Sequence, residues 1–316
     1  MLSAVTLLLI ALTAQNAEPK LPGPEKLLVP GAKLEKLWGE GAFTEGGALE
    51  ADGGILFSDI GNKILKYDPV KNAVTVFREP SRRANGLIFD PSGRLIAAEG
   101  ANTGGGRRVS ITELDGKVRT LADSFQGKRF NSPNDVAVDQ AGRVYLSDPR
   151  YQGDEPRELD FEGVFQIDPD GSVARLETTA KKPNGLAISP DGKTLYVADS
   201  GPTRQALIAL DLSAKGEVSN PRVLHDFGKT RGIDGMTVSA DGNVVASAGS
   251  GATGGVYVFT PQGKLEGVIP VPEPPTNVEF GGSDRSILYV TAGKSLYRIH
   301  TDMKGFHLWP VISAKR

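Results

Sequence analysis

Short stretches in which apolar and polar residues alternate recur along the chain, and each pair of stretches is separated by a turn sequence. The segment 134–138, for example, is followed by Gly142 and then by the apolar stretch 144–148. Alternation with a period of two predicts β-strands, and Asp-Gly pairs predict tight reversals because glycine supplies a positive φ that aspartate also tolerates. Beyond the N-terminal apolar segment no stretch has a helical period. The pattern therefore predicts an all-β protein.

Six segments repeat the same order of strand, turn and second strand. We call the residue that opens each segment its anchor; the six anchors are Glu45, Asn85, Asn134, Asn184, Asp234 and Asn277, separated by 40, 49, 50, 50 and 43 residues. A third strand follows each pair, as at 63–67 and 163–167, and a fourth comes after another turn. Four strands per repeat of this length are typical of β-propellers. The sequence predicts a six-bladed β-propeller with four-stranded antiparallel blades.

The ring of such a propeller has to close. A strand-like stretch at 32–38 precedes the first anchor, and the last blade otherwise ends with the strand-like stretch 295–300. We predict that these two stretches pair, because pairing removes exposed strand edges. The propeller is then one domain over residues 18–316.

The anchors are also the candidate functional site. Each is expected at the start of its blade's innermost strand, and these starts meet at one mouth of the central pore. All six anchors carry a carbonyl or carboxylate oxygen, and only Glu45 and Asp234 are carboxylates. Such a set suits a hard cation such as calcium. Asparagine and aspartate before glycine are also ordinary turn and strand-entry residues, but six in register favour a site.

Composition and charge exclude several classes of function. Lys and Arg number 36 and Asp and Glu number 38, so no single-sign excess points to nucleic acid or an anionic membrane. The absence of cysteine excludes a disulfide framework, a thiolate nucleophile and a cysteine zinc site. No G-x-S-x-G pattern of a serine hydrolase is present. The pairs Arg82-Arg83 and Arg107-Arg108 are interpreted as solvated loop charges.

The N-terminus carries an apolar run at residues 4–14. Its length fits the core of a signal peptide and is too short to span a bilayer, although no Lys or Arg precedes it. We predict a signal peptide over residues 1–17 and a secreted or periplasmic protein with no membrane span in the mature chain. A retained apolar anchor or a misassigned start is the alternative.

Three strings along the chain, together with the first anchor, resemble those of a known family. They are RFNSPND at 129–135, PNGL at 183–186 and IDGM at 233–236, and the first anchor opens the sequence EGG at 45–47. As an ordered set they resemble the senescence-marker-protein/gluconolactonase/luciferin-regenerating family from about residue 45 to residue 293. The family has proline where this chain has Gly47.

The resemblance implies a six-bladed propeller that hydrolyses lactones with a bound divalent ion, for which calcium is expected and zinc, magnesium and manganese are alternatives. The family's metal positions match Glu45, Asn184 and Asp234, and Asn134 matches a position that touches metal or substrate. Asp148 matches a carboxylate proposed as acid or base in some lactonases and missing from the sugar-lactonase branch.

Lactone opening needs a polarised carbonyl and a group that takes a proton from water. The catalytic candidates are Asp148 and Asp234. Loops at 100–108 and 150–157 are expected near the pore mouth, although a flexible turn with solvated charges is an equal alternative. The candidate substrate-binding residues are Asn85, Arg107, Asn134, Tyr151 and Arg157. The three histidines, His225, His300 and His307, are interpreted as structural or surface residues.

The sequence therefore predicts an enzyme, a gluconolactonase-like hydrolase acting on the carboxylic ester bonds of lactones. Its partner is a small-molecule lactone or ester. Two alternatives remain: a phosphotriester or aryl-ester hydrolase using the same site, and a non-catalytic extracellular binding propeller with a structural calcium. The sequence leaves the oligomeric state open.

Overall fold

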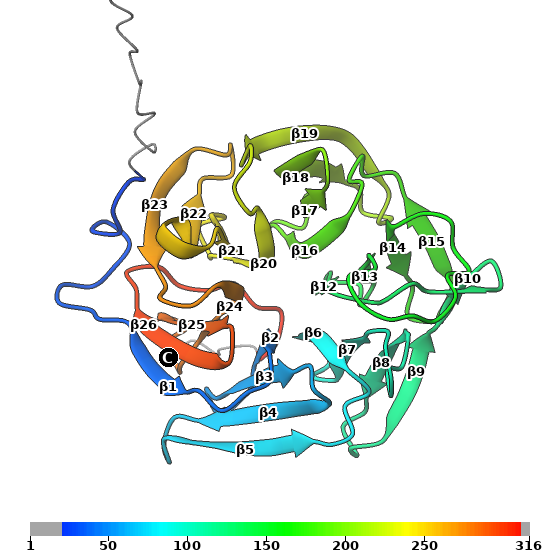
Figure 1. Ribbon diagram of the computed structural model, residues 1–316, viewed down its shortest axis with the longest axis horizontal. Coiled ribbons are helices and arrows are strands. Elements are labelled where there is room, and N and C mark those ends of the chain that lie inside the picture. Colours follow the sequence, from blue (N-terminus) through cyan, green and yellow to red (C-terminus); the bar gives the residue numbers. More distant parts are fainter. Residues whose placement is uncertain (1–20, 311–316) are drawn as a thin grey trace, which may run out of the picture.

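The computed structural model describes residues 21–310 of the 316-residue chain. Six four-stranded antiparallel sheets stand as blades around a central pore (Figure 1), which confirms the predicted six-bladed β-propeller. Within the described residues the one helical element is a 3₁₀ turn at Gly251–Thr253, and no helix is long and apolar enough to cross a membrane. The predicted signal peptide lies outside the described residues.

Each blade runs from a pore-lining strand outward. The first two blades are β2 (Thr44–Leu49), β3 (Ile55–Asp59), β4 (Lys63–Asp68) and β5 (Ala73–Arg78), then β6 (Ala84–Phe89), β7 (Leu95–Glu99), β8 (Arg108–Thr112) and β9 (Val118–Ala122). A small hairpin, β10 (Ser124–Phe125) and β11 (Lys128–Arg129), leads to the third blade, β12 (Val136–Val138), β13 (Val144–Asp148), β14 (Gly163–Ile167) and β15 (Val173–Leu176).

The second half of the ring repeats this order. The fourth and fifth blades are β16 (Pro183–Ile188), β17 (Thr194–Gly201), β18 (Arg204–Leu212) and β19 (Val218–Asp226), then β20 (Ile233–Val238), β21 (Val244–Ala248), β22 (Gly255–Phe259) and β23 (Leu265–Pro270). The sixth blade is β24 (Pro275–Gly281), β25 (Ile287–Ala292), β26 (Ser295–His300) and β1 (Glu35–Trp38).

The sixth blade contains the predicted closure. Strand β1 pairs antiparallel with β26, so that Glu35 lies opposite Arg298 and Lys36 lies opposite Tyr297. Glu273, in the turn before β24, ties the two strands together. Its Oε1 accepts hydrogen bonds from Lys36 Nζ at 3.0 Å and from Tyr297 Oη at 2.6 Å. The strand that begins the ring is thus held by the strand that ends it.

The closure should weaken in acid. Burial alone would raise the pKa of Glu273, but hydrogen bonds from Ser295, Tyr297 and Lys36 outweigh burial and lower the pKa to about 2. A carboxyl whose pKa is depressed in the folded state stabilises the fold above its unfolded pKa, and this contribution is lost as the pH falls from about 4.5 towards 2. Urea unfolding of the Glu273→Gln variant between pH 2.5 and 6 should show a shallower loss of stability in acid than the parent. The exposed change Glu177→Gln is the control, and an unchanged acid dependence in Glu273→Gln would contradict this role.

The hydrophobic core lies between neighbouring blades. One cluster joins Tyr145 of the third blade to Leu186 and Val197 of the fourth, and another joins the fourth to the fifth. Because β-branched and aromatic side chains alternate on both faces of the middle strands, each sheet buries both faces against its neighbours. This stacking fixes the direction of the inner strands, and with it the positions of the side chains at the pore.

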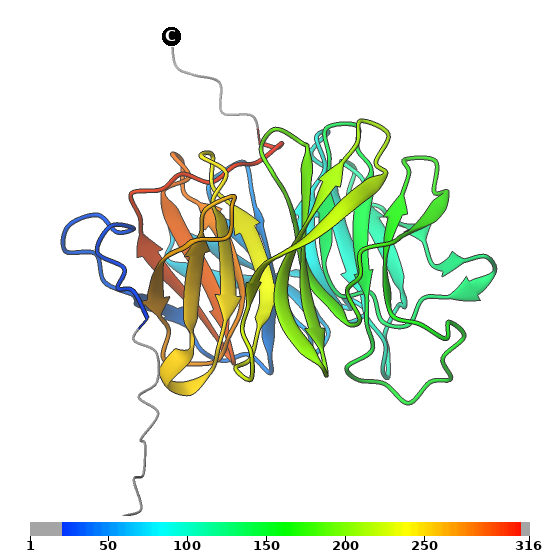
Figure 2. The same ribbon diagram turned by 90° about the horizontal axis from the view of Figure 1, so that it is seen from above.

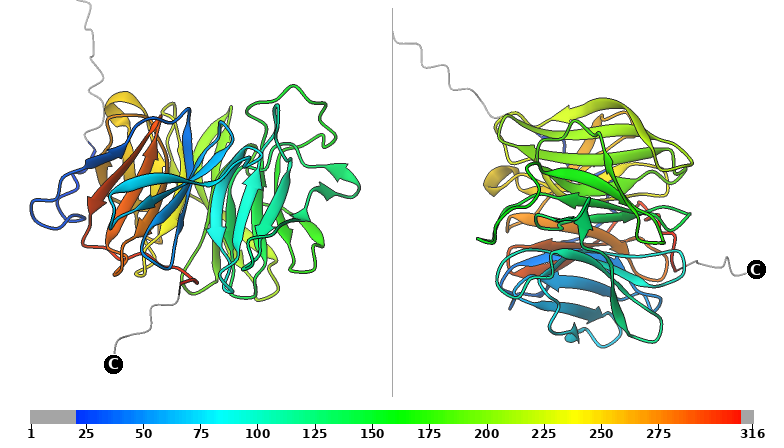
Figure 3. Two further views of the ribbon diagram at one scale, coloured as in Figure 1. Left: turned by 90° about the horizontal axis from the view of Figure 1, so that it is seen from below. Right: turned by 90° about the vertical axis from the view of Figure 1, so that its right-hand side faces the viewer.

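The pore has two mouths, one on each of the two faces of the ring that Figures 2 and 3 show edge-on. We call the one where the inner strands begin the anchor mouth. The C-terminal segment after β26 runs along the opposite face, and we call that end the C-terminal mouth. Each mouth has its own cavity.

Candidate functional site

The anchors open the inner strands as the repeats predicted. Glu45, Asn85, Asn184 and Asp234 are each the second residue of their strands, and Asn134 lies just before β12. All five line one cavity of about 430 Å³ at the anchor mouth. The sixth anchor, Asn277, lines the cavity at the other mouth instead. The structure therefore brings together five of the six predicted residues, although almost 190 positions separate the first from the last.

Glycine after the anchor brings neighbouring inner strands close together. A methyl group on Gly185 would overlap the carbonyl oxygen of Asp234 in the next blade, and one on Gly46 would overlap the carbonyl oxygen of Asn85. The same close approach to the neighbouring blade occurs at two further glycines, Gly86 and Gly235. The inner strands can approach in this way only because glycine has no Cβ. The glycines thus set the narrow spacing of the anchor side chains.

Glu45 is a buried carboxyl with few partners. It is 5% exposed, and its Oε2 accepts one hydrogen bond, from the amide of Gly46 at 3.3 Å. Burial raises the pKa of Glu45 well above its usual value, and the neighbouring carboxylates of Asp234 and Asp135 raise it further. The charged form of Glu45 would be stabilised by a cation in the cavity.

Asp234 is held from two sides. Its Oδ1 accepts a hydrogen bond from Asn184 Nδ2 at 2.8 Å, and its Oδ2 accepts one from the guanidinium of Arg231. Burial raises the pKa of Asp234, whereas Arg231 and the Asn184 hydrogen bond act in the opposite direction. The carboxyl plane of Asp234 is therefore fixed relative to the cavity.

Arg231 was not predicted from the sequence. Its guanidinium also donates to the carbonyl oxygens of Gly249 at 3.1 Å and Pro275 at 2.7 Å, and the side chain lines the cavity beside Asp234. The fixed fork of arginine donors suits this arrangement of three acceptors. The feature of the sequence that could have indicated Arg231 is its position three residues before the anchor Asp234, in the string RGID.

Arg83, in a loop as predicted, has a place at the cavity that the sequence did not indicate. It lines the cavity, and its Nη2 donates to Gln152 Oε1 at 3.3 Å. Its φ of 59° places the backbone in the left-handed region. The loop at 79–83 therefore brings the side chain to the mouth, which sequence spacing alone does not reveal.

The donor set fits a hard divalent cation. Two carboxylates, Glu45 and Asp234, and two amides, Asn134 and Asn184, line the same cavity, and all four offer oxygen. Oxygen ligands with two negative charges suit calcium and other hard dications. Among residues 21–310 no three His, Cys, Asp or Glu side chains gather as a metal site, and the anchors offer a mixture of carboxylates and amides instead.

Asp148 lies behind the cavity wall. It is fully buried and is not a lining residue; its two oxygens accept hydrogen bonds from the amides of Asn131 and Ser132, each at 2.7 Å. Burial raises the pKa of Asp148 to about 7, against the lowering effect of these amides. The carboxyl thus supports the loop that carries Asn134, and its proton-transfer role stays a prediction.

The candidate substrate-binding residues divide into two groups. Asn85, Asn134 and Tyr151 line the cavity. Arg107 does not: it is 5% exposed, and its Nε donates to a backbone carbonyl at 2.9 Å, so its interpretation as a solvated charge is wrong. Arg157 pairs with a glutamate at 2.9 Å and also lies outside the lining. A substrate role for these two arginines stays a prediction.

Comparison with known proteins gives consistent relatives. The family model of the SMP-30/gluconolactonase/LRE-like region matches residues 38–294. A gluconolactonase of Zymomonas mobilis is 29% identical over 315 residues, which cover 90% of this chain and 85% of that one. A regucalcin of Xenopus laevis is 32% identical, covering 77% of this chain and 80% of that one. A solved gluconolactonase structure from Xanthomonas campestris is 28% identical with a TM-score of 0.79, covering 90% of this chain and 96% of that one.

These matches agree with the motifs from which the family was predicted, and they extend over nearly all of the propeller. The relatives named as lactone-hydrolysing enzymes support the expected class of hydrolase. The chain belongs to the SMP-30/gluconolactonase/LRE-like family.

Proposed function

We propose that the protein opens lactones by hydrolysis at the anchor mouth, with a divalent cation held by Glu45, Asn184 and Asp234 and with Asn134 facing the cation or the substrate. The observation that carries the proposal is the convergence of two carboxylates, the buried Glu45 and the largely buried Asp234, with two amides on one cavity of about 430 Å³. A cavity of this size accommodates a small ring substrate. Relatives named gluconolactonase and pentonolactonase support a sugar lactone as substrate.

The chemistry divides between the cation and the chain. When bound, the cation supplies Lewis-acid polarisation of the lactone carbonyl. Asp234 is the lining carboxylate best placed to accept the proton of the attacking water, because Asn184 and Arg231 fix its orientation. The water oxygen bonds to the carbonyl carbon, the ring C–O bond breaks, and the proton passes to the leaving ring oxygen. Asn85, Asn134 and Tyr151 are positioned to orient ring substituents.

Calcium is the proposed ion because every candidate ligand offers oxygen, and zinc, magnesium and manganese are the alternatives. We also propose that the protein acts outside the cytoplasm, on the basis of the apolar run at residues 4–14. The competing functions are hydrolysis of phosphotriesters or aryl esters at the same cavity, and ligand binding without catalysis.

The test is hydrolysis of glucono-1,5-lactone by purified protein at constant pH, before and after chelation with EDTA. We expect turnover that is lost on chelation and restored by one of the four ions, with calcium tried first. Thermal unfolding in the same samples reports whether the ion also stabilises the fold. Turnover of aryl esters or phosphotriesters without lactones would favour the second function. A stabilising ion without any turnover would favour the binding propeller.

A further inference from the structure

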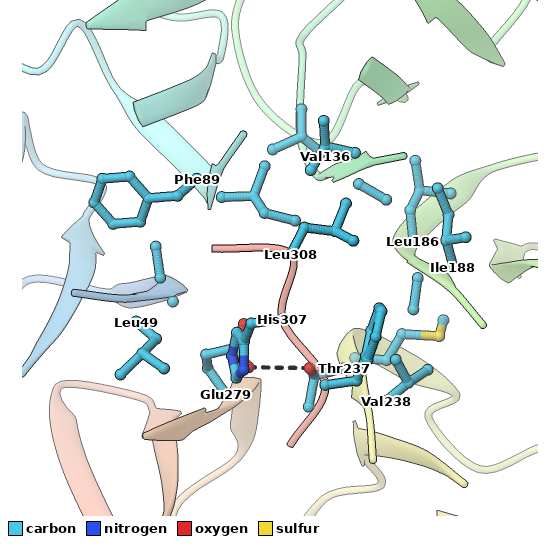
Figure 4. A pocket seen from close by; sticks show the side chains of 18 of the residues that line it. Leu49, Phe89, Val136, Leu186, Ile188, Thr237, Val238, Glu279, His307 and Leu308 are labelled. Carbon is cyan, nitrogen blue, oxygen red and sulfur yellow. Dashed lines mark hydrogen bonds and ion pairs between the residues drawn. The ribbon is translucent and has the colours of Figure 1, made fainter. Parts of the chain in front are cut away.

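A second cavity lies at the C-terminal mouth. Its volume is about 300 Å³, and its wall combines the inner strands with the C-terminal segment 306–309 (Figure 4). Figure 4 shows side chains of several blades turned towards one space. Most of the lining is apolar, including Leu49, Phe89, Val136, Leu186, Ile188, Val238, Phe306, Leu308 and Trp309. Nothing in the lactonase proposal uses this cavity.

The C-terminal segment is a fixed part of the wall. The amide of Phe306 donates to the carbonyl oxygen of Val238 at 3.1 Å, which attaches the segment to the fifth blade. On the other side of the pore the ring of Trp309 lies 4.5 Å from the ring of Phe89, in the second blade. The segment therefore crosses the mouth between two blades and adds Phe306 and Trp309 to the lining of the cavity.

The charges that line the cavity are almost all of one sign. Among the described residues, the lining has one histidine, His307, and four carboxylates, Asp135, Asp139, Asp191 and Glu279, but no lysine or arginine. Asp139 is already paired with Arg143 at 2.7 Å, and both oxygens of Asp135 accept backbone amides. Glu279 has more capacity than these two carboxylates to accept a hydrogen bond from a ligand.

The hydrogen bonds of the Glu279 side chain within the described residues all involve one of its two oxygens. Its Oε1 accepts hydrogen bonds from Thr237 Oγ1 at 3.0 Å and from the amide of Phe280 at 2.7 Å, and it lies 3.0 Å from His307 Nε2. Within the described part of the chain, its Oε2 accepts no hydrogen bond. The side chain is 13% exposed and lines the cavity, and its Oε2 atom is not fully buried, so this oxygen is accessible from the cavity. An accessible carboxylate oxygen without a protein donor can accept a hydrogen bond from a cationic ligand that enters the cavity.

We propose that this cavity binds a small organic cation, an amine or quaternary ammonium attached to an apolar body. The apolar body would fill the space between the inner strands. The ammonium would pair with Glu279, while Trp309 and Phe89 would contact the apolar body from another part of the lining. A carboxylate-bearing ligand is disfavoured by the acidic lining. The site is separate from the anchor mouth and does not depend on lactone hydrolysis.

Tryptophan fluorescence provides a local test. The chain has two tryptophans, so the Trp38→Phe variant leaves Trp309 as the only one. In that background we would titrate three probes that share a phenyl ring: 2-phenylethylammonium, neutral 2-phenylethanol and anionic phenylacetate. We expect a saturable change in Trp309 emission with the ammonium, a Kd about tenfold higher for the alcohol, and no saturable change with phenylacetate.

Two variants separate this site from its alternatives. Glu279→Gln should raise the Kd of the ammonium about tenfold with little change for the alcohol, whereas the exposed change Glu40→Gln should alter neither. Glu45→Gln at the anchor mouth should also leave both values unchanged. If Glu279→Gln fails to fold, Glu279→Asp provides the second test: it keeps the charge but draws the carboxylate back from the cavity, and it should weaken the ammonium more than the alcohol. Equal Kd values for ammonium and alcohol, the absence of saturable binding, or a folded Glu279→Gln variant with parental affinity would each overturn the proposal.

Discussion

Asp234→Asn is expected to lower the kcat of lactone hydrolysis by at least about 100-fold while the protein stays folded. The change keeps the size of the side chain but removes the negative charge that the proposed cation and the attacking water both require. It also leaves the Arg231 guanidinium without its carboxylate partner. The measurement is kcat with glucono-1,5-lactone at saturating calcium, together with calcium affinity by titration calorimetry. We expect both to decrease.

The matched control for this change is Asp241→Asn, which alters an exposed turn aspartate of the same blade and should leave kcat unchanged. Circular dichroism and thermal unfolding would show whether either variant has lost structure. Activity of Asp234→Asn within twofold of the parent would refute the role of Asp234 as ligand and proton acceptor, even if the enzyme still needed a metal.

Gly185→Ala is expected to remove activity and to destabilise the fold by about 3 kcal/mol. The added methyl group would overlap the carbonyl oxygen of Asp234, so the fourth and fifth inner strands would have to move apart. Asn184 and Asp234 would separate with them, and the 2.8 Å hydrogen bond between them would break. Urea unfolding and kcat, measured on the same preparation, check both effects.

Gly192→Ala is the control, because Gly192 provides a positive φ in a turn and does not pack closely against another strand. Gly192 lies in the turn between β16 and β17 with a φ of 69°, and a methyl group added there would meet no other atom within 4 Å. Alanine at this position should cost about 1 kcal/mol through backbone strain and leave kcat unchanged. If both variants lost stability equally and kept full activity, close packing of the inner strands would not be what places the anchors.

The part of the site that repeats could be predicted from the sequence. Asn184 and Asp234 occupy equivalent positions 50 residues apart, and equivalent positions in a ring of blades meet at one mouth. The same reasoning predicted Asn277 at that mouth, but Asn277 lines the cavity at the other mouth. No glycine follows Asn277, and its Oδ1 accepts the amide of Val278 at 2.8 Å, which turns the side chain back onto its own strand.

The residues that do not repeat could not be predicted in this way. Arg83 and Arg231 reach the cavity through the paths of individual loops, and a long side chain can point to solvent or to the pore from the same position. Asp148 shows the converse. The resemblance to the family implied an acid or base at this position, and Asp148 lies inside the wall, where its oxygens accept hydrogen bonds from two loop amides. Whether such a side chain reaches the cavity depends on the geometry of its loop, and the spacing of residues in the sequence does not show that geometry.

The pairing of β1 with β26 also determines when the ring can be completed. Glu35 and Arg298 are 263 positions apart, so the first strand to leave the ribosome has no partner until the chain is almost finished. Until then the sixth blade has an open edge and the first blade has no neighbour on one side. Assembly is therefore expected to be slow and to follow release of the chain, since contacts between distant positions form late. A nascent chain stalled before residue 295 would expose two unpaired surfaces that only its own missing end can cover.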